Sequence, residues 1–375
     1  MNTIRKGPLP PRVYIIILNW NGWKDTIECL ESILKSDYPN YCIVVIDNGS
    51  LDDSGERIQA WARGDRIVEP SYVERCADGK PLRVVLYDRT TAENGGIAET
   101  EQELSLLSAE QKLVLIQCGE NLGFAGGCNT GIRYVLAVGG EYVWLLNNDT
   151  VVESSALLNL INFMESHSDY QGVTGQIRLY KDPSVIWNCG GTLTFYGSRR
   201  YYYSNSQIAE VPQHGFRKIS LITGCAAIFR TSLFKKVGLM SDLFFYGEED
   251  IELAQRLKRS GYKLACLYDA IIYHKVGSSI NSASCGRNIA MIYIYYLNRF
   301  INMRYYWPEF PWRVWRYCCF FYIFPLLKLK HGTPWKDLWS LRKALLKDST
   351  TLDRVSKATF EQALGFGFGK DLKRP

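Results

Sequence analysis

Continuous apolar runs alternate with stretches of helical spacing in the first half of the chain. Residues 13–18 and 41–46 contain no charge and are rich in Ile and Val, the composition of strands buried on both faces of a parallel sheet. Between them, Ile27, Leu30 and Ile33 recur on one helical face. Strand, helix and strand of these lengths predict a right-handed βαβ unit.

The same alternation returns after a polar interval. Residues 113–117 and 142–146 are predicted strands, followed by predicted helices at about 128–138 and 153–166. Four strands alternating with helices predict an α/β fold, a Rossmann-like sheet flanked by helices, with ligands at the carboxyl ends of the strands. Residues 63–111 show little periodicity, and we interpret most of them as an insertion.

The second half changes character. Short β-like segments punctuated by glycine precede a predicted helix at 249–259. Residues 262–267 and 270–274 are predicted as two further short strands. Because proline interrupts a helix interior, we predict that the helical stretch after residue 287 is interrupted at Pro308, Pro311, Pro325 and Pro334.

Size and composition indicate an ordered globular chain. Its 375 residues allow one large domain at residues 1–285 and a helical extension at residues 286–375. Hydrophobic residues make up 47% and charged residues 22%, which excludes a disordered protein. The net charge is only +6, and we expect no nucleic-acid partner. The 24 Tyr and 10 Trp residues favour sugars, bases or a membrane interface as partners.

The cysteines and the N-terminus bear on the compartment. The 11 cysteines are scattered and include no C-x-x-C pair, so neither a disulfide framework nor a zinc knuckle is indicated. The apolar run at residues 13–18 is too short for a signal peptide. We therefore expect a cytoplasmic protein.

Basic residues concentrate near the C-terminus. From Arg299 to Lys347 there are ten Lys or Arg residues against Glu309 and Asp337. The uncharged run at residues 317–327 is shorter than the roughly 20 residues that span a bilayer. Two interpretations stay open: an interfacial helix on the inner face of the cell membrane, or a basic helix packed on the core.

Two apolar runs end abruptly in acidic residues. Residues 142–146 are followed by Asn147, Asn148 and Asp149, and an aromatic run is followed by Glu248, Glu249 and Asp250. A carboxylate at the end of a buried strand requires a cation or a proton. One end suits metal binding and the other suits proton abstraction, and together they suggest group transfer from a phosphorylated donor.

Each candidate residue also has a structural interpretation. Asp47 follows a strand and suits a base or ribose contact, but it also suits an Asx-turn or helix cap. Glycines at residues 121–127 allow either an anion near the backbone or tight packing. Asp149 suits Mg²⁺ or a helix cap, and His274 suits a metal or a structural role. Asp250 suits a helix N-terminus by its charge alone, although its acidic neighbours raise at least one pKa towards that of a base.

Taken in order, five segments resemble the family 2 glycosyltransferases of the GT-A fold, especially their rhamnosyltransferase-like branch. These segments are residues 17–22, 45–50, 120–129, 145–149 and 249–253, and the resemblance covers roughly residues 13–304. It implies an inverting transfer of a sugar, with rhamnose suggested, from a dTDP- or UDP-sugar to a glycan or lipid-linked acceptor. It also implies a divalent metal, Mg²⁺ or Mn²⁺.

The resemblance assigns roles to particular residues. Asp250 would be the catalytic base, with Glu249 beside it. Asp149 and His274 would hold the metal. Donor-binding residues would be Asn19, Asn21, Asp47, Asn121, Gly123, Phe124, Gly127, Asn148 and Arg299. Acceptor-binding residues would be Trp187, Gly224 and Cys225.

The chain also departs from the family pattern. Asn148 replaces a carboxylate, residues 63–111 lengthen one connection, and no Q-x-x-R-W motif is present, which favours single-sugar addition over polymerisation. Two other functions stay open. A sugar-nucleotide nucleotidylyltransferase uses a similar sheet. This chain, however, lacks the basic Gly-rich loop directly after the first strand that would support this function. A carbohydrate-binding protein accounts for the aromatic residues but not for Asp149 and Asp250.

Overall fold

The computed structural model describes residues 10–65, 81–194, 199–276 and 285–365. Their contacts form two compact units. Unit 1 contains residues 1–122, 126–240 and 253–279, and unit 2 contains residues 123–125, 241–252 and 280–375. Residues 277–279, which follow shortly after His274, and the tail from residue 366 lie outside the described residues.

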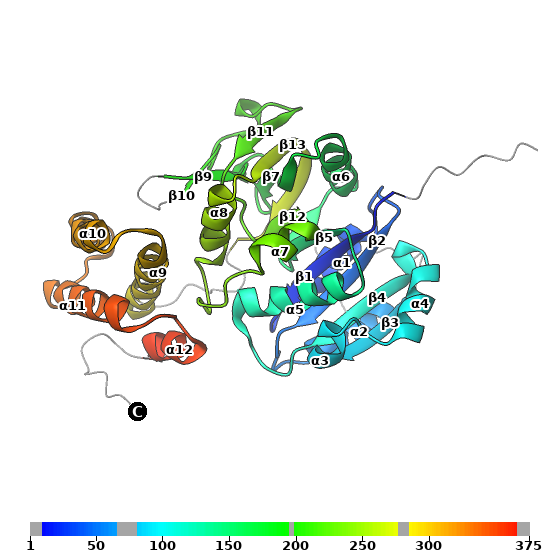
Figure 1. The fold of residues 1–375 in the computed structure, drawn as a ribbon, viewed down its shortest axis with the longest axis horizontal. Coiled ribbons are helices and arrows are strands. Elements are labelled where there is room, and N and C mark those ends of the chain that lie inside the picture. Colours follow the sequence, from blue (N-terminus) through cyan, green and yellow to red (C-terminus); the bar gives the residue numbers. More distant parts are fainter. Residues whose placement is uncertain (1–9, 66–80, 195–198, 277–284, 366–375) are drawn as a thin grey trace, which may run out of the picture. The chain divides into compact units, whose positions relative to one another are not determined.

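Parallel strands form one half of the unit 1 sheet (Figure 1). Their order is β5 (Tyr142–Asn147), β1 (Val13–Asn19), β2 (Tyr41–Asp47), β4 (Lys112–Gln117) and β3 (Arg83–Asp88). The register of β1 and β2 confirms the predicted βαβ unit around α1 (Trp23–Ile33). The edge strand β3 comes from the predicted insertion, of which residues 66–80 lie outside the described residues.

The other half of the sheet is mixed. Antiparallel β12 (Ala226–Arg230) joins β5 to β7 (Tyr170–Leu179), β7 pairs in parallel with β13 (Lys263–His274), and β11 (Phe216–Ile219) forms the edge. Short β6 (Thr150–Val152) and β8 (Ile186–Asn188) pair with β13 and β7. A separate ribbon pairs β9 (Gly191–Leu193) with β10 (Arg199–Tyr201).

Helices lie on both faces of the sheet, and the alternation along β1 explains why. Ile15 and Ile17 join a core cluster that includes Leu30 of α1. Ile16 faces α5, where a Cβ added to Gly131 would lie 2.9 Å from it. The other helices are α2 (Ser54–Arg63), α3 (Arg89–Glu93), α4 (Ala98–Leu106), α5 (Gly123–Ala137), α6 (Ala156–Ser166), α7 (Thr231–Val237) and α8 (Glu249–Arg259), with short 3-10 turns at Ala109–Gln111 and Ile208–Glu210.

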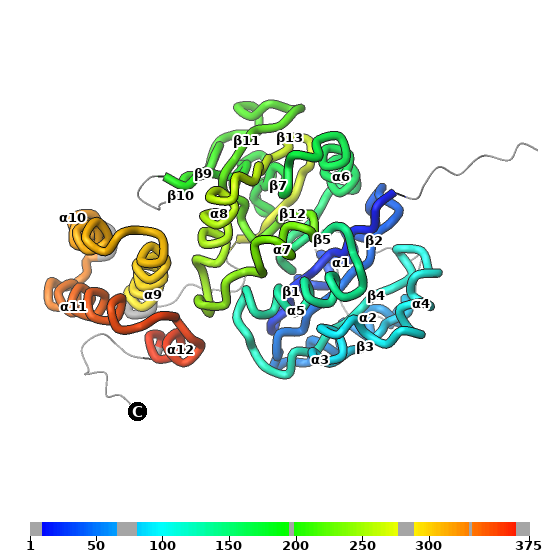
Figure 2. The backbone as a smooth tube through the Cα atoms, in the orientation of Figure 1, coloured from blue at the N-terminus to red at the C-terminus, as the bar shows by residue number. Residues whose placement is uncertain are grey.

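Unit 2 is mainly a bundle of the C-terminal helices (Figure 2). These helices are α9 (Cys285–Tyr306), α10 (Glu309–His331), α11 (Trp335–Thr351) and α12 (Lys357–Gly365). Their core contains Leu297, Phe300, Ile323 and Leu341, together with Phe244 from the loop before α8. The predicted domain boundary between residues 285 and 286 stays a prediction. The loop before α8 precedes this boundary in the sequence, yet its Phe244 contributes to the core of unit 2.

Three predicted elements were wrong in detail. Residues 262–274 form one strand, β13, instead of two, because a register shift between Leu267 and Ile271 absorbs the irregular residues while β7 remains its partner. Helix α10 continues through Pro311 and Pro325. Pro311 lies in the first turn, where the backbone N–H has no helical partner, and Ile323 and Leu327 bury the helix face around Pro325. Helix α5 begins at Gly123, before the predicted start.

Candidate functional site

The carboxyl ends of β1, β2 and β5 lie together at one edge of the unit 1 sheet. Asn19 pairs in register with Asp47, and Leu18 pairs with Asn147. Asp47 is the last residue of β2, and Asp149 follows the end of β5 by two residues. Both aspartates are buried. The structure therefore brings two of the predicted motifs to the edge at which open α/β sheets bind ligands.

One chain of hydrogen bonds connects the two motifs. Asn19 Nδ2 donates to Asp47 Oδ1 at 3.2 Å, and Thr26 Oγ1 donates to Asn19 Oδ1 at 2.8 Å. Asn148 Nδ2 donates to Thr26 Oγ1 at 3.1 Å. Thr26 was not predicted, because a hydroxyl in the first turn of a helix carries no sequence signal of its own. Gly22 makes room for this arrangement, since a Cβ there would lie 2.6 Å from Asn148 Nδ2.

Turn contacts hold Asp47 as well. Ser50 Oγ donates to Asp47 Oδ1 at 2.5 Å, and Asn19 Nδ2 also donates to Ser50 Oγ. Asn21, at φ 50°, accepts a hydrogen bond from the Leu51 amide at 2.7 Å. Asn19 and Asn21 therefore fix the turn that orients Asp47, and their direct contacts with a donor stay a prediction.

The Gly-rich segment shows the close packing that was its structural interpretation. Asn48 Nδ2 donates to Asn121 Oδ1 at 3.1 Å. A Cβ on Gly127 would lie 2.3 Å from Leu18 Cδ1. Gly123, at φ 75°, lies against Phe245, and the Phe124 amide donates to the Phe245 carbonyl oxygen. These glycines are explained by packing, and a contact between this segment and an anion stays a prediction.

Asp149 and His274 form the predicted metal pair. Strand β6 pairs with β13 so that Thr150 is opposite His274, which brings Asp149 Oδ1 to 3.1 Å from His274 Nε2. The side chains of both residues are only 7% exposed. His274 Nδ1 is buried without a hydrogen-bond partner among the described residues. The described residues contain no group of three or more His, Cys, Asp or Glu side chains that could hold a metal.

The predicted acceptor residues lie around the same pair. The Trp187 ring lies 4.5 Å from the His274 ring. The Asn147 amide donates to the Cys225 carbonyl oxygen at 2.8 Å, next to Gly224. Trp187 and Cys225 therefore approach the Asp149 turn from β8 and from the segment before β12, although acceptor contacts themselves stay a prediction.

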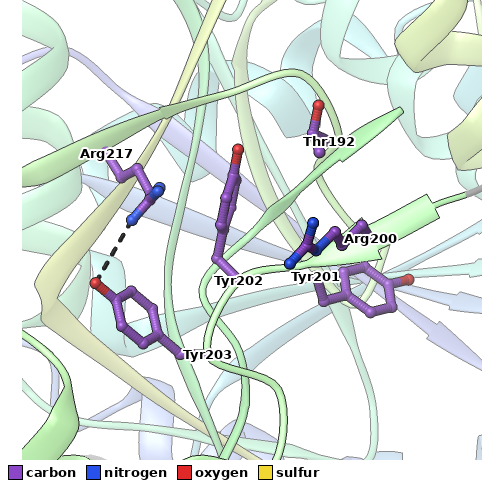
Figure 3. Close-up of a pocket in the computed structure, with 6 residues that line it drawn as sticks. All are labelled: Thr192, Arg200, Tyr201, Tyr202, Tyr203 and Arg217. Atoms are coloured by element: carbon purple, nitrogen blue, oxygen red, sulfur yellow. Dashed lines mark hydrogen bonds between the residues drawn. The ribbon is translucent and has the colours of Figure 1, made fainter. Parts of the chain in front are cut away.

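A cavity of about 460 Å³ lies among the residues drawn in Figure 3. Its lining residues come from β9, β10, β11 and the turn after β10: Thr192, Arg200, Tyr201, Tyr202, Tyr203 and Arg217. Tyr201 connects it to the metal pair, because its ring lies 6.2 Å from that of Trp187. This cavity could not be predicted from the residue pattern, since its residues lie on short strands without a recognisable motif.

In unit 2, the helices of the C-terminal extension hold the acidic loop before α8. Glu248 Oε1 accepts hydrogen bonds from Arg299 Nε at 2.6 Å and from Asn302 Nδ2 at 2.8 Å. Asn298 Nδ2 donates to the carbonyl oxygens of Tyr246 and Gly247. Arg299 was predicted to bind the donor; the structure shows it buried, with its side chain 3% exposed and ion-paired to Glu248.

The three consecutive acids therefore have different environments. Burial raises the pKa of Glu248, Arg299 and Asn302 oppose this effect, and Asp250 contributes a smaller increase. A raised pKa in this cluster was predicted from repulsion between the acids, but burial is the main cause for Glu248. Glu248 also has φ 85°, a strained conformation held by the contacts of its side chain. Glu249 is buried, whereas Asp250 is partly exposed at the start of α8.

Comparisons with known proteins identify the family. A model described as "Glycosyltransferase like family 2" matches residues 95–291, and one described as "Glycosyl transferase family 2" matches residues 14–75. An uncharacterized protein of Mycobacterium tuberculosis is 30% identical over 162 residues, 42% of this chain and 55% of that protein. Galactofuranosyltransferase GlfT1 of the same organism is 26% identical over 173 residues, 44% of this chain and 54% of GlfT1. The chain thus spans about half the length of these curated relatives.

A solved structure supports the fold. GalNAc-T7, solved with UDP, GalNAc and Mn²⁺, aligns with a TM-score of 0.52 at 13% identity, covering 96% of this chain and 57% of that one. This similarity confirms the predicted mixed α/β sheet of GT-A type with flanking helices. With the family model matching more than half of its length, this chain belongs to the glycosyltransferase-like family 2.

Proposed function

We propose that this chain transfers a sugar from a nucleotide-diphosphate donor to a hydroxyl group of a glycan or lipid-linked acceptor, with inversion at the anomeric carbon. The observation that carries the proposal is the contact between Asp149 and His274, at the same edge of the sheet at which β2 ends in Asp47. Membership of the family supports glycosyl transfer, as does the UDP bound by the structurally similar GalNAc-T7.

The Asp149–His274 pair suits a divalent metal. Two atoms that bind one ion at about 2.1 Å in an octahedral arrangement lie roughly 3 Å apart, close to the 3.1 Å between Asp149 Oδ1 and His274 Nε2. The buried Nδ1 of His274, without a hydrogen-bond partner among the described residues, leaves the tautomer free to present Nε2 to an ion. An imidazole ligand favours Mn²⁺ over Mg²⁺, which prefers oxygen. When bound, the ion would stabilise the charge of the departing diphosphate.

The remaining roles belong to side chains of this chain. Asp47 would accept a hydrogen bond from the nucleoside, held in place by Asn19 and Thr26. Asp250 would take the proton of the acceptor hydroxyl as that oxygen forms a bond to the anomeric carbon. The bond from that carbon to the diphosphate oxygen breaks, and the nucleoside diphosphate leaves with the electron pair.

The finer identity of the reaction is also proposed. Rhamnose from a dTDP-sugar follows from the branch that the sequence resembles, whereas the similarity to galactofuranosyltransferase GlfT1 adds a galactofuranosyl donor to those worth testing.

Metal-dependent donor binding is the direct test. We expect the thermal midpoint of the full chain to rise with a UDP- or dTDP-sugar plus Mn²⁺, more than with either alone, because ligands that bind only the folded state stabilise it. Slow release of the nucleoside diphosphate should accompany this stabilisation.

Other outcomes would favour the alternatives. Formation of a nucleoside triphosphate from the nucleotide sugar and pyrophosphate would indicate a nucleotidylyltransferase. Stabilisation by free saccharides, with no effect of any nucleotide sugar or metal, would indicate a carbohydrate-binding protein. The family match supports neither of these alternatives.

A further inference from the structure

The cavity beside Trp187 has an unusual charge balance. Its described lining contains two guanidinium groups, three phenol rings and one hydroxyl group, and no carboxylate. Arg217 Cζ lies 4.0 Å from the centroid of the Tyr202 ring, and Arg217 Nη1 lies 3.5 Å from the Tyr203 hydroxyl oxygen. Figure 3 shows Arg217 and Arg200 on opposite sides of Tyr202. These contacts orient Arg217 without neutralising its charge.

The cavity also lies close to the proposed reaction site. The centroid of the Trp187 ring lies 4.5 Å from that of His274 and 6.2 Å from that of Tyr201. A sugar stacked on Tyr201 would therefore be connected to His274 through the rings of Tyr201 and Trp187. Aromatic faces stack on sugar rings, and guanidinium groups bind carboxylates and phosphates through paired hydrogen bonds.

We propose that this cavity binds an acidic saccharide of the acceptor, with Arg217 and Arg200 contacting its carboxylate or phosphate group and Tyr201 stacking on its sugar ring. This inference rests on the proposed transferase function, since an acceptor site presupposes transfer. It adds the chemical class of the acceptor, a negatively charged glycan, which neither the family nor the metal pair determines.

Binding of simple saccharides to the full chain, without donor or metal, tests this proposal. We expect calorimetry to show tighter binding of a methyl glucuronide or a hexose phosphate than of the neutral methyl glucoside. Preference for the glucuronide would identify a carboxylate, and preference for the hexose phosphate would identify a phosphate. Equal binding of all three would overturn the proposal.

Matched variants locate the effect. Arg217→Gln should weaken binding of the preferred acidic saccharide at least about tenfold, because a hydrogen bond to a charged group is lost, while leaving the glucoside nearly unchanged. Lys218→Gln, the exposed neighbour on the same strand outside the lining, should have no effect. An equal loss in both variants would also overturn the proposal. Donor-dependent stabilisation of the wild type is measured separately, so failure of the acidic-saccharide site and failure of the transferase function give different results.

A second and independent feature is an exposed apolar surface on unit 2, which we name the aromatic face. It comprises Phe310, Val314, Tyr317, Phe321, Tyr322 and Leu329 of α10 with Trp335 and Trp339 of α11. Phe321 is 83% and Leu329 86% exposed. The opposite side of α10 buries Phe320, Ile323 and Leu327 in the core of unit 2, so the aromatic face is additional to a core that is already packed.

Positive charge accompanies the aromatic face. The sequence contains no Asp or Glu between Phe310 and Trp335. Arg342 Cζ lies 5.5 Å from the Tyr317 ring and 5.3 Å from the Trp339 ring, and Lys328 Nζ lies 5.6 Å from the Trp335 ring. Exposed Trp and Tyr rings next to Lys and Arg are typical of helices that lie in the headgroup region of an anionic membrane. Among the helices that the structure describes, none combines the length and hydropathy needed to cross a bilayer.

We infer that the aromatic face binds the surface of an anionic phospholipid bilayer, with α10 lying parallel to the membrane. The apolar side chains would enter the boundary between headgroups and acyl chains, and Lys328 and Arg342 would contact lipid phosphates. This inference does not depend on the transferase reaction, and its test does not measure activity.

Co-sedimentation of the full chain with lipid vesicles tests this inference. We expect binding to vesicles of phosphatidylcholine mixed with phosphatidylglycerol, weaker binding to phosphatidylcholine alone, and a decrease at high salt as charges are screened. The double variant Phe321→Gln/Leu329→Gln should lower the partition coefficient at least about tenfold, because apolar burial is lost. Leu51→Gln/Leu106→Gln, which changes two leucines of unit 1 that are 92% and 82% exposed, should bind like the wild type.

Three results would overturn the inference. The first is equal binding by both double variants, and the second is no binding by the wild type. The third is a wild-type dimer in light scattering that becomes monomeric in Phe321→Gln/Leu329→Gln, which would show that a second copy of the chain covers the aromatic face.

Discussion

Replacing Asp250 with asparagine is expected to lower the rate of sugar transfer by about 100- to 10,000-fold, the usual contribution of a general base. Asparagine has nearly the same shape as aspartate but cannot accept the proton of the acceptor hydroxyl. Initial rates with saturating donor and acceptor measure this effect. Donor affinity, measured by calorimetry, should change little, because the proposed donor contacts belong to Asp47 and Asp149.

The neighbouring acid Glu252 provides the control. It lies in the first turn of the same helix and accepts a hydrogen bond from the Tyr306 hydroxyl at 2.7 Å, a bond that Glu252→Gln can keep. This variant should retain most of the activity and have a similar thermal midpoint. Activity that survives in Asp250→Asn, or that is lost equally in both variants, would assign the base to another residue.

Replacing Asp149 with asparagine should remove the proposed metal site. We expect Mn²⁺ affinity to fall more than the roughly 10- to 100-fold that follows loss of residues that only orient metal ligands, because Asp149 itself would be a ligand. Electron paramagnetic resonance of Mn²⁺ in the presence of a nucleotide sugar measures this directly. Transfer rates should fall in parallel, since the diphosphate would lose its stabilising charge.

Glu153→Gln is the matched control for this change. Glu153 lies close in the sequence but accepts a hydrogen bond from the Tyr273 hydroxyl at 2.5 Å, away from His274 Nε2. It should bind Mn²⁺ as the wild type does. Unchanged Mn²⁺ binding in Asp149→Asn would refute the metal site, even if activity fell.

The parts of the fold that the sequence predicted are those with strong periodicity. Strands β1, β2, β4 and β5 are continuous apolar runs that only a sheet covered on both faces can bury. Their polar ends indicated the site, because parallel strands bring their carboxyl ends to one edge. The pairing of Asp149 with His274 followed from the family resemblance, and it appears as a direct contact at 3.1 Å.

What could not be predicted depends on contacts between distant segments. Thr26 connects Asn19 and Asn148, but a threonine in a helix is ordinary until the strand ends are placed beside it. Strand β13 continues through the register shift between Leu267 and Ile271 because β7 pairs with it on both sides of the shift. Arg299 matched a recurrent family position, yet its partner Glu248 is 51 residues away, and only the fold shows that this arginine neutralises a buried acid.

The contact between Arg299 and Glu248 has a consequence for the design of fragments of this chain. The matching family model ends at residue 291, whereas the side chains that fix the loop ahead of Asp250 are Asn298, Arg299 and Asn302. A fragment that ends at residue 291 would lack these three side chains, including the Arg299 guanidinium that pairs with Glu248. Under the proposed role of Asp250 as the base, helix α9 would help to position it, so a fragment prepared for activity measurements should extend beyond residue 291.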